Sequence, residues 1–411
     1  MGSRNSEEEA RYIRITDIDE YGLLKNNIGV TAEIIEKQYI LKNNDILFAR
    51  SGATVGKAYL HKSNSVNYKC FYAGYMIRFL VNEKLLLPDF LFCYTQLKVY
   101  KEWVKAIQRT AGQPNINAEE YKSLNIPVPP LEIQTKIISI LKTAYTSKKQ
   151  KEAEAAALLA SIDHYLLQKL GITLPPATAK KTVFYTRISK ISGGRFDALS
   201  NQTDIFSIFK TGEFNLVTIK EITNYLKTGF AAGKQDQDLE GMGVIQIRPT
   251  NIKEPERDLT FGRNVYIKSS EIKTRTTDLL QKNELLFNNT NSQVLVGKTT
   301  LFNLEGDYFC SNHMTRIGVN EKVDSIYLTH ILNLYQHLNV FYLMCVNWNN
   351  QSGVNTEMLR SIKIPLPPIN KQNEIAEHIE TLRNQAKQLQ QQAKVELEKA
   401  KQEVERLILG S

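Results

Sequence analysis

Two glycine-lysine segments are the strongest candidates for chemistry in this sequence, because they resemble a phosphate-binding loop. Residues 51–58 read SGATVGKA, so three residues separate the glycines where the loop needs four, and Ala58 stands where a Ser or Thr would hold Mg²⁺. Residues 292–299 read SQVLVGKT, which supplies the Thr but has Ser292 in place of the first glycine. Each segment lacks a different part of a nucleotide site. We interpret both as tight turns between strands, with a lysine pointing out of each turn.

No other set of residues has the spacing of a catalytic or metal site. Glu271 and Lys273 resemble the end of a nuclease Glu-x-Lys motif, but no well-placed Pro-Asp pair precedes them. The sequence has neither the Asn/Asp-Pro-Pro-aromatic motif of amino-methyltransferases nor a glycine-rich S-adenosylmethionine loop. Its six histidines are scattered, and its four cysteines form no CxxC pair, so we expect structural histidines and buried, reduced thiols rather than zinc ligands. We therefore predict a non-catalytic chain with no metal.

Basic and amide side chains remain, and they gather in segments expected to form domain loops. Arg and Lys neutralise phosphates, Arg reads guanine, and Asn or Gln reads adenine in the major groove. Solvated surface is the plainer interpretation of any single one, and Arg78 and Arg316, set among apolar residues, can instead be structural ion-pair partners. The second half also offers Arg248. We predict DNA contacts at Arg50, Lys57, Lys105, Arg109, Gln113, Arg263, Arg275, Asn289, Asn291, Lys298 and Asn349.

An internal repeat positions these residues. Residues 76–84 recur as 314–322, and residues 117–130 recur as 355–368, both 238 positions later. The glycine-lysine turns match with a shift of a few residues, as do residues 14–18 with 248–252 and 41–48 with 280–287. A repeat this long is a duplicated domain rather than a solenoid unit. The second copy extends about 70 residues upstream of Arg248, whereas few residues precede Arg14, so we expect a first domain that is shortened at its start.

A long helix is expected after each copy, because each ends in Ile-Pro-x-Pro-Pro and Pro-Pro favours a domain-to-helix junction. Apolar residues follow at spacings of mostly three and four, which is the pattern of a narrow helical seam. Such helices need a partner, so we expect the two to pair antiparallel, which would place the domains at opposite ends. The alternatives are packing of each helix on its own domain or on another protein. The predicted seam comprises Ile137, Leu141, Leu159, Ile162, Leu166, Ile375, Ile379, Leu382, Leu389, Leu397 and Val404.

The domains themselves mix short β-like runs, such as residues 45–48, 75–81 and 284–287, with helical ones at 89–106 and 325–345. The predicted fold class is therefore α/β (α+β) domains in tandem, each followed by a long helix. We place the first domain at 4–130, its helix at 131–171, a linker and entry segment at 172–213, the second domain at 214–368 and its helix at 369–409.

The bulk composition agrees with a nucleic-acid partner. The net charge of +9 and pI near 9.1 favour a polyanion, while 42% hydrophobic and 23% charged residues are ordinary for a globular protein. No run of about 18 apolar residues suggests a membrane span, and no charged-then-apolar leader opens the sequence. We therefore expect a cytoplasmic protein without membrane attachment.

These motifs occur in the same order in both copies of the repeat, and together they resemble those of the specificity subunit of type I restriction-modification systems. The resemblance is carried by Ile-Pro-x-Pro-Pro before Gln134 or Gln372 and a long helix, by Asn-Asp-Ile-Leu-Phe with Val-Gly-Lys downstream, and by Gly-Arg-Phe-Asp-Ala at 194–198. The chain departs from the family's frequent Glu-Gln pair, with Lys371 before Gln372. The shortened first half is the larger departure, and it puts reading by the first domain in doubt.

The resemblance implies two target-recognition domains, each reading one half of a split sequence in double-stranded DNA, and an antiparallel coiled coil that measures the spacer. It further implies docking of two methyltransferase subunits and of restriction subunits. S-adenosylmethionine, ATP and Mg²⁺ would be bound by those partners, and no cofactor by this chain. The alternatives are a coiled-coil scaffold, or a silent recombination cassette, without DNA reading of its own. An enzyme is the third alternative, and it lacks any supporting motif.

Overall fold

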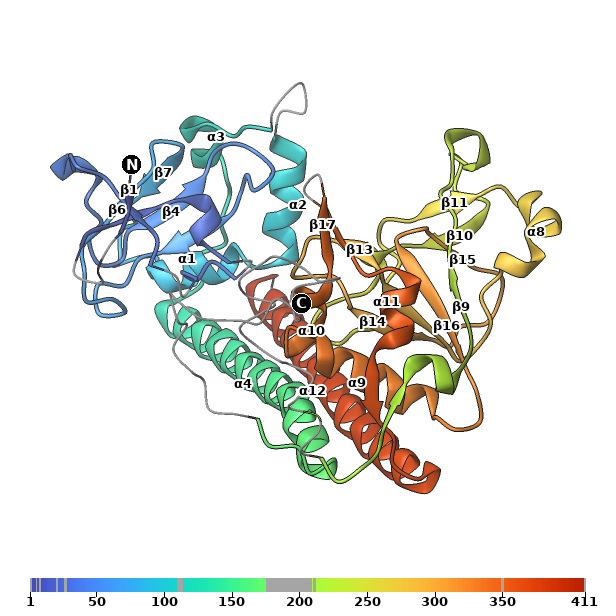
Figure 1. Cartoon of the computed structure of the whole chain (residues 1–411). Coiled ribbons are helices and arrows are strands. Elements are labelled where there is room, and N and C mark those ends of the chain that lie inside the picture. Colours follow the sequence, from blue (N-terminus) through green and yellow to red (C-terminus); the bar gives the residue numbers. More distant parts are fainter. Residues whose placement is uncertain are drawn as a thin grey trace. The chain divides into compact units, whose positions relative to one another are not determined.

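The chain forms two compact units in the computed structural model, which describes residues 2–4, 6, 9–19, 21–25, 28–108, 114–174, 209, 212–348 and 351–409 (Figure 1). Unit 1 comprises Met1–Glu152 with Gln390–Ser411, and unit 2 comprises Ala153–Leu389. Both long helices therefore contribute residues to each unit. The predicted linker and entry segment at 172–213 lies almost entirely outside the described residues.

Unit 1 contains two small sheets. The first has the strand order β1-β3-β2-β6 and the second the order β5-β4-β7. In the second sheet β4 pairs antiparallel with both neighbours, and all four of its residues are buried. The strands are β1 (Gly2–Ser3), β2 (Arg11–Ile13), β3 (Val30–Thr31), β4 (Ile46–Ala49), β5 (Ala58–Leu60), β6 (Cys70–Tyr72) and β7 (Met76–Phe79).

Three short helices, α1 (Pro88–Tyr94), α2 (Lys98–Ile107) and α3 (Ala118–Lys122), pack on the β5-β4-β7 sheet of unit 1. The Asn117 side chain caps α3 by accepting a hydrogen bond from the Glu120 backbone N–H, and the Asn117 backbone N–H donates to the Glu120 carboxylate. The rings of Phe48 and Tyr121 meet in this core with centroids 5.0 Å apart.

Unit 2 repeats this arrangement with additional strands. Its sheets have the orders β14-β12-β16-β9, β11-β10-β15, β13-β18-β17 and β19-β8. Buried strand β12 again lies between two antiparallel neighbours. The strands are β8 (Leu216–Thr218), β9 (Thr223–Thr228), β10 (Val244–Ile247), β11 (Val265–Ile267), β12 (Glu284–Asn288), β13 (Thr290–Asn291), β14 (Thr299–Phe302), β15 (Phe309–Cys310), β16 (Met314–Val319), β17 (Val346–Trp348), β18 (Gln351–Gly353) and β19 (Lys363–Pro365).

The helices of unit 2 are α8 (Glu271–Thr274), α9 (Ser325–His337), α10 (Val340–Met344) and α11 (Thr356–Ser361). Three of them, α9 to α11, follow the same order as α1 to α3 of unit 1, and α8 is additional. Nine residues of helix α9 are buried, and six of them lie in the unit's main core, where the Tyr327 hydroxyl donates to the Pro365 carbonyl oxygen at 2.8 Å. The equivalence of β4, β5 and β7 with β12, β14 and β16 agrees with the duplicated domain expected from the repeat.

The two predicted helical runs are helical, but each is divided into two helices, and these breaks were not predicted from the sequence. The run at 89–106 divides into α1 and α2 because Leu97 is extended, and the run at 325–345 divides into α9 and α10 because Asn339 is left-handed, with φ of 62°. Asparagine accepts this conformation more readily than most residues. All four cysteines are buried and free, and burial raises the pKa of the Cys70 thiol to about 11.

The long helices α4 (Leu131–Lys169) and α12 (Ile369–Leu409) begin where the Pro-Pro pairs predicted. Gln134 and Gln372, both fully buried, tie each helix start to its domain. Gln134 accepts from the Leu87 N–H at 2.8 Å, and Gln372 accepts from the Asp324 N–H at 2.9 Å. The motif glutamines therefore fix the start of each long helix to the backbone of its domain.

Within each unit the two long helices contribute to one core. In unit 1 the Lys151 ammonium binds Glu396 at 2.6 Å. In unit 2 Tyr165 stacks on His378, and Lys169 binds Glu374 at 3.2 Å, so residue numbers on α12 fall as those on α4 rise. Three of the predicted seam residues, Leu159, Leu382 and Leu389, are half-buried. The other eight are buried, namely Ile137, Leu141, Ile162, Leu166, Ile375, Ile379, Leu397 and Val404.

Candidate nucleic-acid interface

The two lysines of the glycine-lysine turns bind inside their own domains. Lys57 Nζ donates to the Ile18 carbonyl oxygen at 2.6 Å, and Lys298 Nζ donates to that of Ile252 at 2.9 Å. These are equivalent contacts, because the repeat aligns the two isoleucines as well as the two lysines. Lys298 is only 6% exposed, and burial lowers the pKa of its ammonium group. The expectation that each lysine points out of its turn is therefore wrong, and both lysines join two segments of the domain.

Arg316 and Arg78 each form an ion pair with an acidic side chain of their own unit, as the alternative interpretation of these two arginines predicted. Arg316 Nη2 lies 2.7 Å from Glu284 Oε1, and both side chains are less than 5% exposed. Arg78 Nη1 lies 3.5 Å from Asp45 Oδ2, with the arginine side chain 26% exposed. Both arginines also donate to backbone carbonyl oxygens of the preceding loop. Their role in the described contacts is structural.

Two further candidates in unit 2 have internal partners. Asn289 is 7% exposed and donates to the Asn312 carbonyl oxygen and the Thr315 hydroxyl, at 3.2 and 2.9 Å. Arg275 binds Glu271 at 3.0 Å, and its guanidinium carbon lies 4.2 Å from the centre of the Phe230 ring. Asn289 therefore belongs to the framework, and Arg275 presents at most one side of its guanidinium to a ligand.

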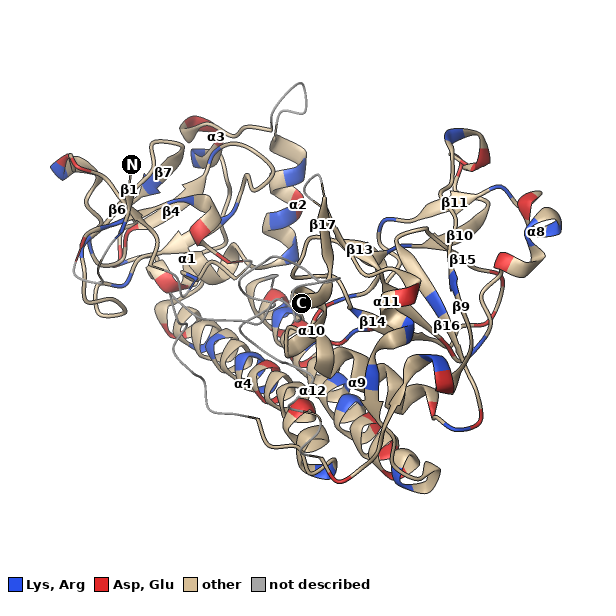
Figure 2. Cartoon of the chain, in the orientation of Figure 1, with Lys and Arg blue, Asp and Glu red and all other residues tan. Residues whose placement is uncertain are grey.

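The remaining candidates divide by exposure. Lys105 and Arg263 are exposed and Arg50 is half-buried. Lys105 lies on α2, along which Figure 2 shows several basic residues in blue. Arg109, Gln113 and Asn349 lie outside the described residues, so their placement stays a prediction.

A polar cavity of about 510 Å³ opens in unit 2 where the chain leaves β10, β13 and β15 and enters β18. Its lining contains cationic, amide and hydroxyl side chains and no carboxylate. Asn291, one of the predicted contacts, lies at its edge, and its side chain accepts from the Ser292 N–H at 2.8 Å. The polar lining residues are Arg248, Thr250, Thr290, Asn291, Ser292, Ser311, Asn312, His313 and Gln351.

Arg248 is the charged group of this cavity. Its Nη2 donates to Gln246 Oε1 at 3.1 Å, whereas its Nε, and the hydroxyl of nearby Ser311, are buried without a hydrogen-bond partner among the described residues. Burial lowers the pKa of the Arg248 guanidinium, and the ion pairs of the described chain include none to this residue. A buried donor without a partner costs about 1–3 kcal/mol, so a ligand that accepts from Arg248 recovers that free energy.

The equivalent arginine of unit 1 is neutralised. Arg14 binds Asp17 through Nε and Nη2, at 3.0 and 2.9 Å, and these hydrogen bonds raise the pKa of Arg14. Burial alone would raise the pKa of Asp17, but the bonds from Arg14 outweigh burial and lower it. In unit 2 the residue matching Asp17 is Asn251, which cannot form an ion pair. The two units therefore present chemically different surfaces at the same position.

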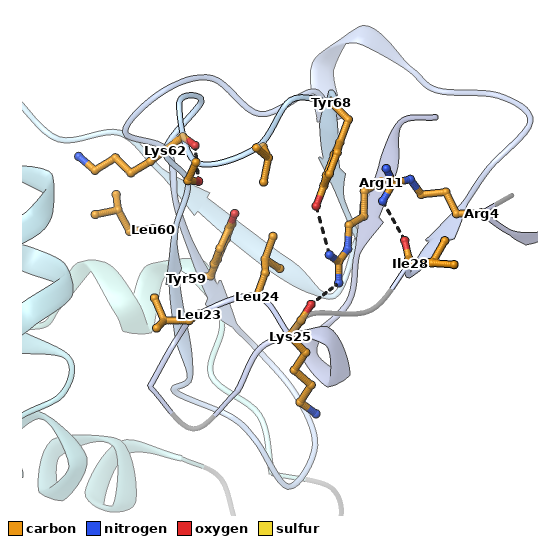
Figure 3. A pocket seen from close by; sticks show the side chains of 12 residues that line it. Arg4, Arg11, Leu23, Leu24, Lys25, Ile28, Tyr59, Leu60, Lys62 and Tyr68 are labelled. Atoms are coloured by element: carbon orange, nitrogen blue, oxygen red, sulfur yellow. Dashed lines mark hydrogen bonds between the residues drawn. The ribbon is translucent and has the colours of Figure 1, made fainter. Parts of the chain in front are cut away.

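Unit 1 contains a different cavity of about 600 Å³, lined by Arg4, Arg11, Tyr59 and Tyr68 among others (Figure 3). Arg11 donates to the Tyr68 hydroxyl at 3.2 Å and to the Lys25 carbonyl oxygen at 3.3 Å. The Arg4 guanidinium lies 4.0 Å from the centre of the Tyr68 ring. Both arginines are thus engaged in shaping this cavity.

The part of the chain that the structure describes contains no group of three or more His, Cys, Asp or Glu side chains arranged to hold a metal ion. Nor does any of its helices combine the length and apolar character that crossing a bilayer requires.

Sequence reasoning placed Arg248 among the basic residues but did not select it as a contact. A signal was present: the repeat conserves the arginine while changing Arg-x-x-Asp at 14–17 to Arg-x-x-Asn at 248–251. Because Asn251 replaces the carboxylate of Asp17, Arg248 lacks the partner that Arg14 has. This change in sequence indicates that Arg248 is available to a ligand. Asn312, His313 and Gln351 carried no comparable signal, because only the fold brings them together.

Comparisons with a family model, with known sequences and with solved structures all point to the same family. Residues 4–157 and 211–399 both match the family described as Type I restriction modification DNA specificity domain. The type I restriction enzyme StySPI specificity subunit of Salmonella potsdam is 22% identical over 361 residues, which covers 86% of this chain and 71% of that protein. The type I restriction enzyme EcoKI specificity subunit of Escherichia coli is 21% identical over 363 residues, with the same coverage.

A further relative matches over a shorter stretch. The putative type I restriction enzyme MjaX specificity subunit of Methanocaldococcus jannaschii is 26% identical over 169 residues, so the match spans 40% of this chain and 38% of that protein. A solved structure described as "Structural basis underlying complex assembly and conformational transition of the type I R-M system" contains a chain with the same fold. Its TM-score is 0.55 at 15% identity, and the match covers 97% of this chain and 90% of that one. The duplicated domain, with a family match in each half, shows that this chain belongs to the type I restriction modification DNA specificity family.

Proposed function

We propose that this chain is the specificity subunit of a type I restriction-modification complex and reads a bipartite target in double-stranded DNA. The observation that carries the proposal is the cavity around Arg248, where a guanidinium without a carboxylate partner faces amide and hydroxyl groups. Arg can bind guanine through two hydrogen bonds, and Asn or Gln can bind adenine in the same way. The absence of acidic groups from the lining removes repulsion against phosphates.

Two copies of the domain support reading of two half-sites. Because Arg14 is paired with Asp17 whereas Arg248 has no such partner, the two domains would read different half-sites. We propose that α4 and α12 pair as an antiparallel coiled coil and set the length of the unread spacer. The contacts of Lys151 with Glu396 and of Lys169 with Glu374, one in each unit, support this pairing.

The chain's partners would then supply the chemistry. We propose docking of two methyltransferase subunits, which bring S-adenosylmethionine, and of restriction subunits, which use ATP and Mg²⁺. The complex would act in the cytoplasm, where its DNA substrate lies.

Methylome sequencing of cells that express this chain with a cognate methyltransferase subunit tests the proposal. A new motif of two short half-sites is expected. Arg248→Gln should weaken binding to the cognate site by about 1–3 kcal/mol, roughly 5- to 150-fold, and relax one position of one half-site. Arg360→Gln is the matched control, because Arg360 is an exposed arginine whose described side-chain partner is Glu357 on the same short helix.

Arg248→Lys separates base reading from phosphate binding. A lysine keeps the charge but loses the planar fork, so base reading predicts lost sequence preference with an unchanged salt dependence. Retained preference would make Arg248 a phosphate contact. Complexes that assemble but produce no new methylation, together with DNA binding that does not depend on salt, would instead support a scaffold or silent cassette.

A further inference from the structure

A three-stranded sheet in unit 2 adjoins the cavity around Arg248. Its strand order is β13-β18-β17, and the cavity lining includes Thr290 of β13 and Gln351 of β18. Strand β17 lies at one end of this order, and all three of its residues are exposed. Two of them, Val346 and Trp348, are large apolar residues with 47% and 46% of their surface exposed. Exposed apolar side chains next to a binding cavity are candidates for contact with its ligand.

The register of the sheet places Trp348 on the face that borders the cavity. Trp348 lies opposite Gln351, and residues opposite each other in an antiparallel pair have their side chains on the same face. Gly353 follows two residues after Gln351, so it is on that face as well, and it lies opposite Thr290 of β13. The indole therefore shares one face of the sheet with Thr290 and Gln351, which line the cavity.

Gly353 fixes the position of the indole ring. A Cβ atom built on this glycine would lie 2.4 Å from Cη2 and 3.1 Å from Cζ3 of Trp348, so the six-membered part of the indole crosses the glycine backbone. The ring thus lies across the sheet instead of projecting from it. A side chain that is inserted between base steps must project, so this ring does not have the placement of a wedge. It presents a flat apolar surface.

The chemistry of this face matches the major groove of DNA. No residue of β13, β17 or β18 is acidic, and the lining of the adjoining cavity contains no carboxylate. Arginine distinguishes base pairs in the major groove, which is wide enough to admit a two-stranded β-ribbon. The apolar group that bases present in that groove is the C5-methyl group of thymine. A flat apolar ring beside the donors of Arg248 therefore suits a thymine next to the base pair that the arginine binds.

We propose that Trp348 reads a thymine by apolar contact with its C5-methyl group, at a base pair next to the one that Arg248 binds. This inference rests on the proposed function, because it requires the cavity of unit 2 to bind DNA. It adds a specificity-determining residue that acts without a hydrogen bond. It also requires an A·T pair in the half-site that unit 2 reads.

Removal of single methyl groups from the DNA tests this inference. The full-length chain first selects its preferred duplex from a random duplex library, and each thymine of that duplex is then replaced in turn by uracil, which lacks only the methyl group. At one thymine, next to the position that Arg248→Gln relaxes, the replacement should weaken binding of the unchanged chain about four-fold, the factor expected for burial of one methyl group. The same replacement should not affect binding of Trp348→Ala.

Two variants separate base reading from support of the strand pair. Leu239→Ala removes another exposed apolar side chain of unit 2, one that is not among the lining residues, and it should keep the full four-fold sensitivity to uracil. Trp348→Phe keeps an aromatic ring and should retain part of this sensitivity. A purely structural role of Trp348 predicts instead that Trp348→Ala binds more weakly and is as sensitive to uracil as the unchanged chain.

Fluorescence gives an independent readout, because the chain contains two tryptophans. In Trp103→Phe, Trp348 is the remaining one, and the selected duplex should change its emission. In Trp348→Phe the change should be smaller, because Trp103 is stacked on Tyr100 in the core of unit 1. Equal effects of uracil on the unchanged chain and on Trp348→Ala, or unchanged emission of Trp348, would overturn this inference and leave DNA reading intact. A chain that selects no duplex would refute the proposed function as well.

Discussion

The ion pair between Arg316 and Glu284 gives the most decisive test of the packing of unit 2. Arg316 donates from Nε and Nη2 to the Glu284 carboxylate and from Nη1 and Nη2 to two backbone carbonyl oxygens, at 2.7–3.1 Å. Replacement with leucine removes these donors and leaves a carboxylate that is 2% exposed without its cation. Breaking a buried pair in this way costs about 3–5 kcal/mol, so Arg316→Leu should lower the free energy of unfolding of unit 2 by that amount.

Unit 1 supplies the control. The equivalent contact, Arg78 to Asp45, is 3.5 Å long and its arginine is 26% exposed, so water can replace part of what is lost. Arg78→Leu should therefore cost only about 1–2 kcal/mol. Native-state hydrogen exchange resolves the two effects by segment. Amides of β12 and β16 should exchange roughly 150- to 5,000-fold faster in Arg316→Leu, and those of β4 and β7 should be nearly unaffected.

A double variant distinguishes a lost ion pair from lost packing. Glu284→Met with Arg316→Leu removes both charges, and apolar replacement of a buried pair is often neutral or better. The Tyr225 hydroxyl group, on a side chain that is 39% exposed, can then bind water. We expect the double variant to recover most of the stability lost in Arg316→Leu. Equal losses in the single and double variants, or in Arg316→Leu and Arg78→Leu, would refute this account.

Three further changes have expected outcomes. Lys298→Met should lower the free energy of unfolding by about 1–3 kcal/mol, because the carbonyl oxygen to which it donates loses its partner, while the salt dependence of DNA binding stays the same since this ammonium is buried. Gly297→Ala should cost about 2–4 kcal/mol by urea unfolding, because φ is +92° and the new Cβ would lie 2.0 Å from Phe341 Cδ2. Burial lowers the pKa of His330 below 6.5, so its contribution to stability is complete above about pH 6.5 and falls as the pH decreases. His330→Gln, which can still donate to Glu380, should flatten the pH dependence of urea unfolding between pH 7 and 5, and an unchanged slope would contradict this assignment.

The repeat predicted the framework well because framework contacts depend on short, local sequence patterns. The Pro-Pro pairs located the starts of α4 and α12, and the motif Asn-Asp-Ile-Leu-Phe and its counterpart located β4 and β12. The seam residues were also found, since an apolar spacing of three and four defines a helix face wherever the partner lies. The breaks within the runs at 89–106 and 325–345 were missed because a single left-handed or extended residue has little effect on an apolar pattern.

Candidate DNA contacts were harder to predict, because residue type alone determines neither which group a side chain binds nor whether it is exposed. Lys57 and Lys298 were selected for their charge, yet each ammonium group binds a backbone carbonyl oxygen in its own domain. Asn289 was selected for its amide, which is buried. The cavity around Arg248 gathers residues from five separate segments, so only the folded chain reveals it.

The choice of partner in these framework contacts explains how a duplicated domain can keep its fold while the side chains at one position change. The lysine of each glycine-lysine turn binds a main-chain oxygen, of Ile18 in one unit and Ile252 in the other, and a main-chain oxygen is present whatever the side chain. Substitution of nearby side chains therefore leaves this bond intact. The change from Asp17 to Asn251 is such a substitution: the turn keeps its shape, and the asparagine still accepts from the backbone N–H of the arginine three residues earlier. What changes is the guanidinium, which loses its carboxylate and becomes available to a ligand. The surface at this position can thus diverge between the units while backbone acceptors keep the framework, and the cost is the buried Arg248 Nε, which has no hydrogen-bond partner among the described residues.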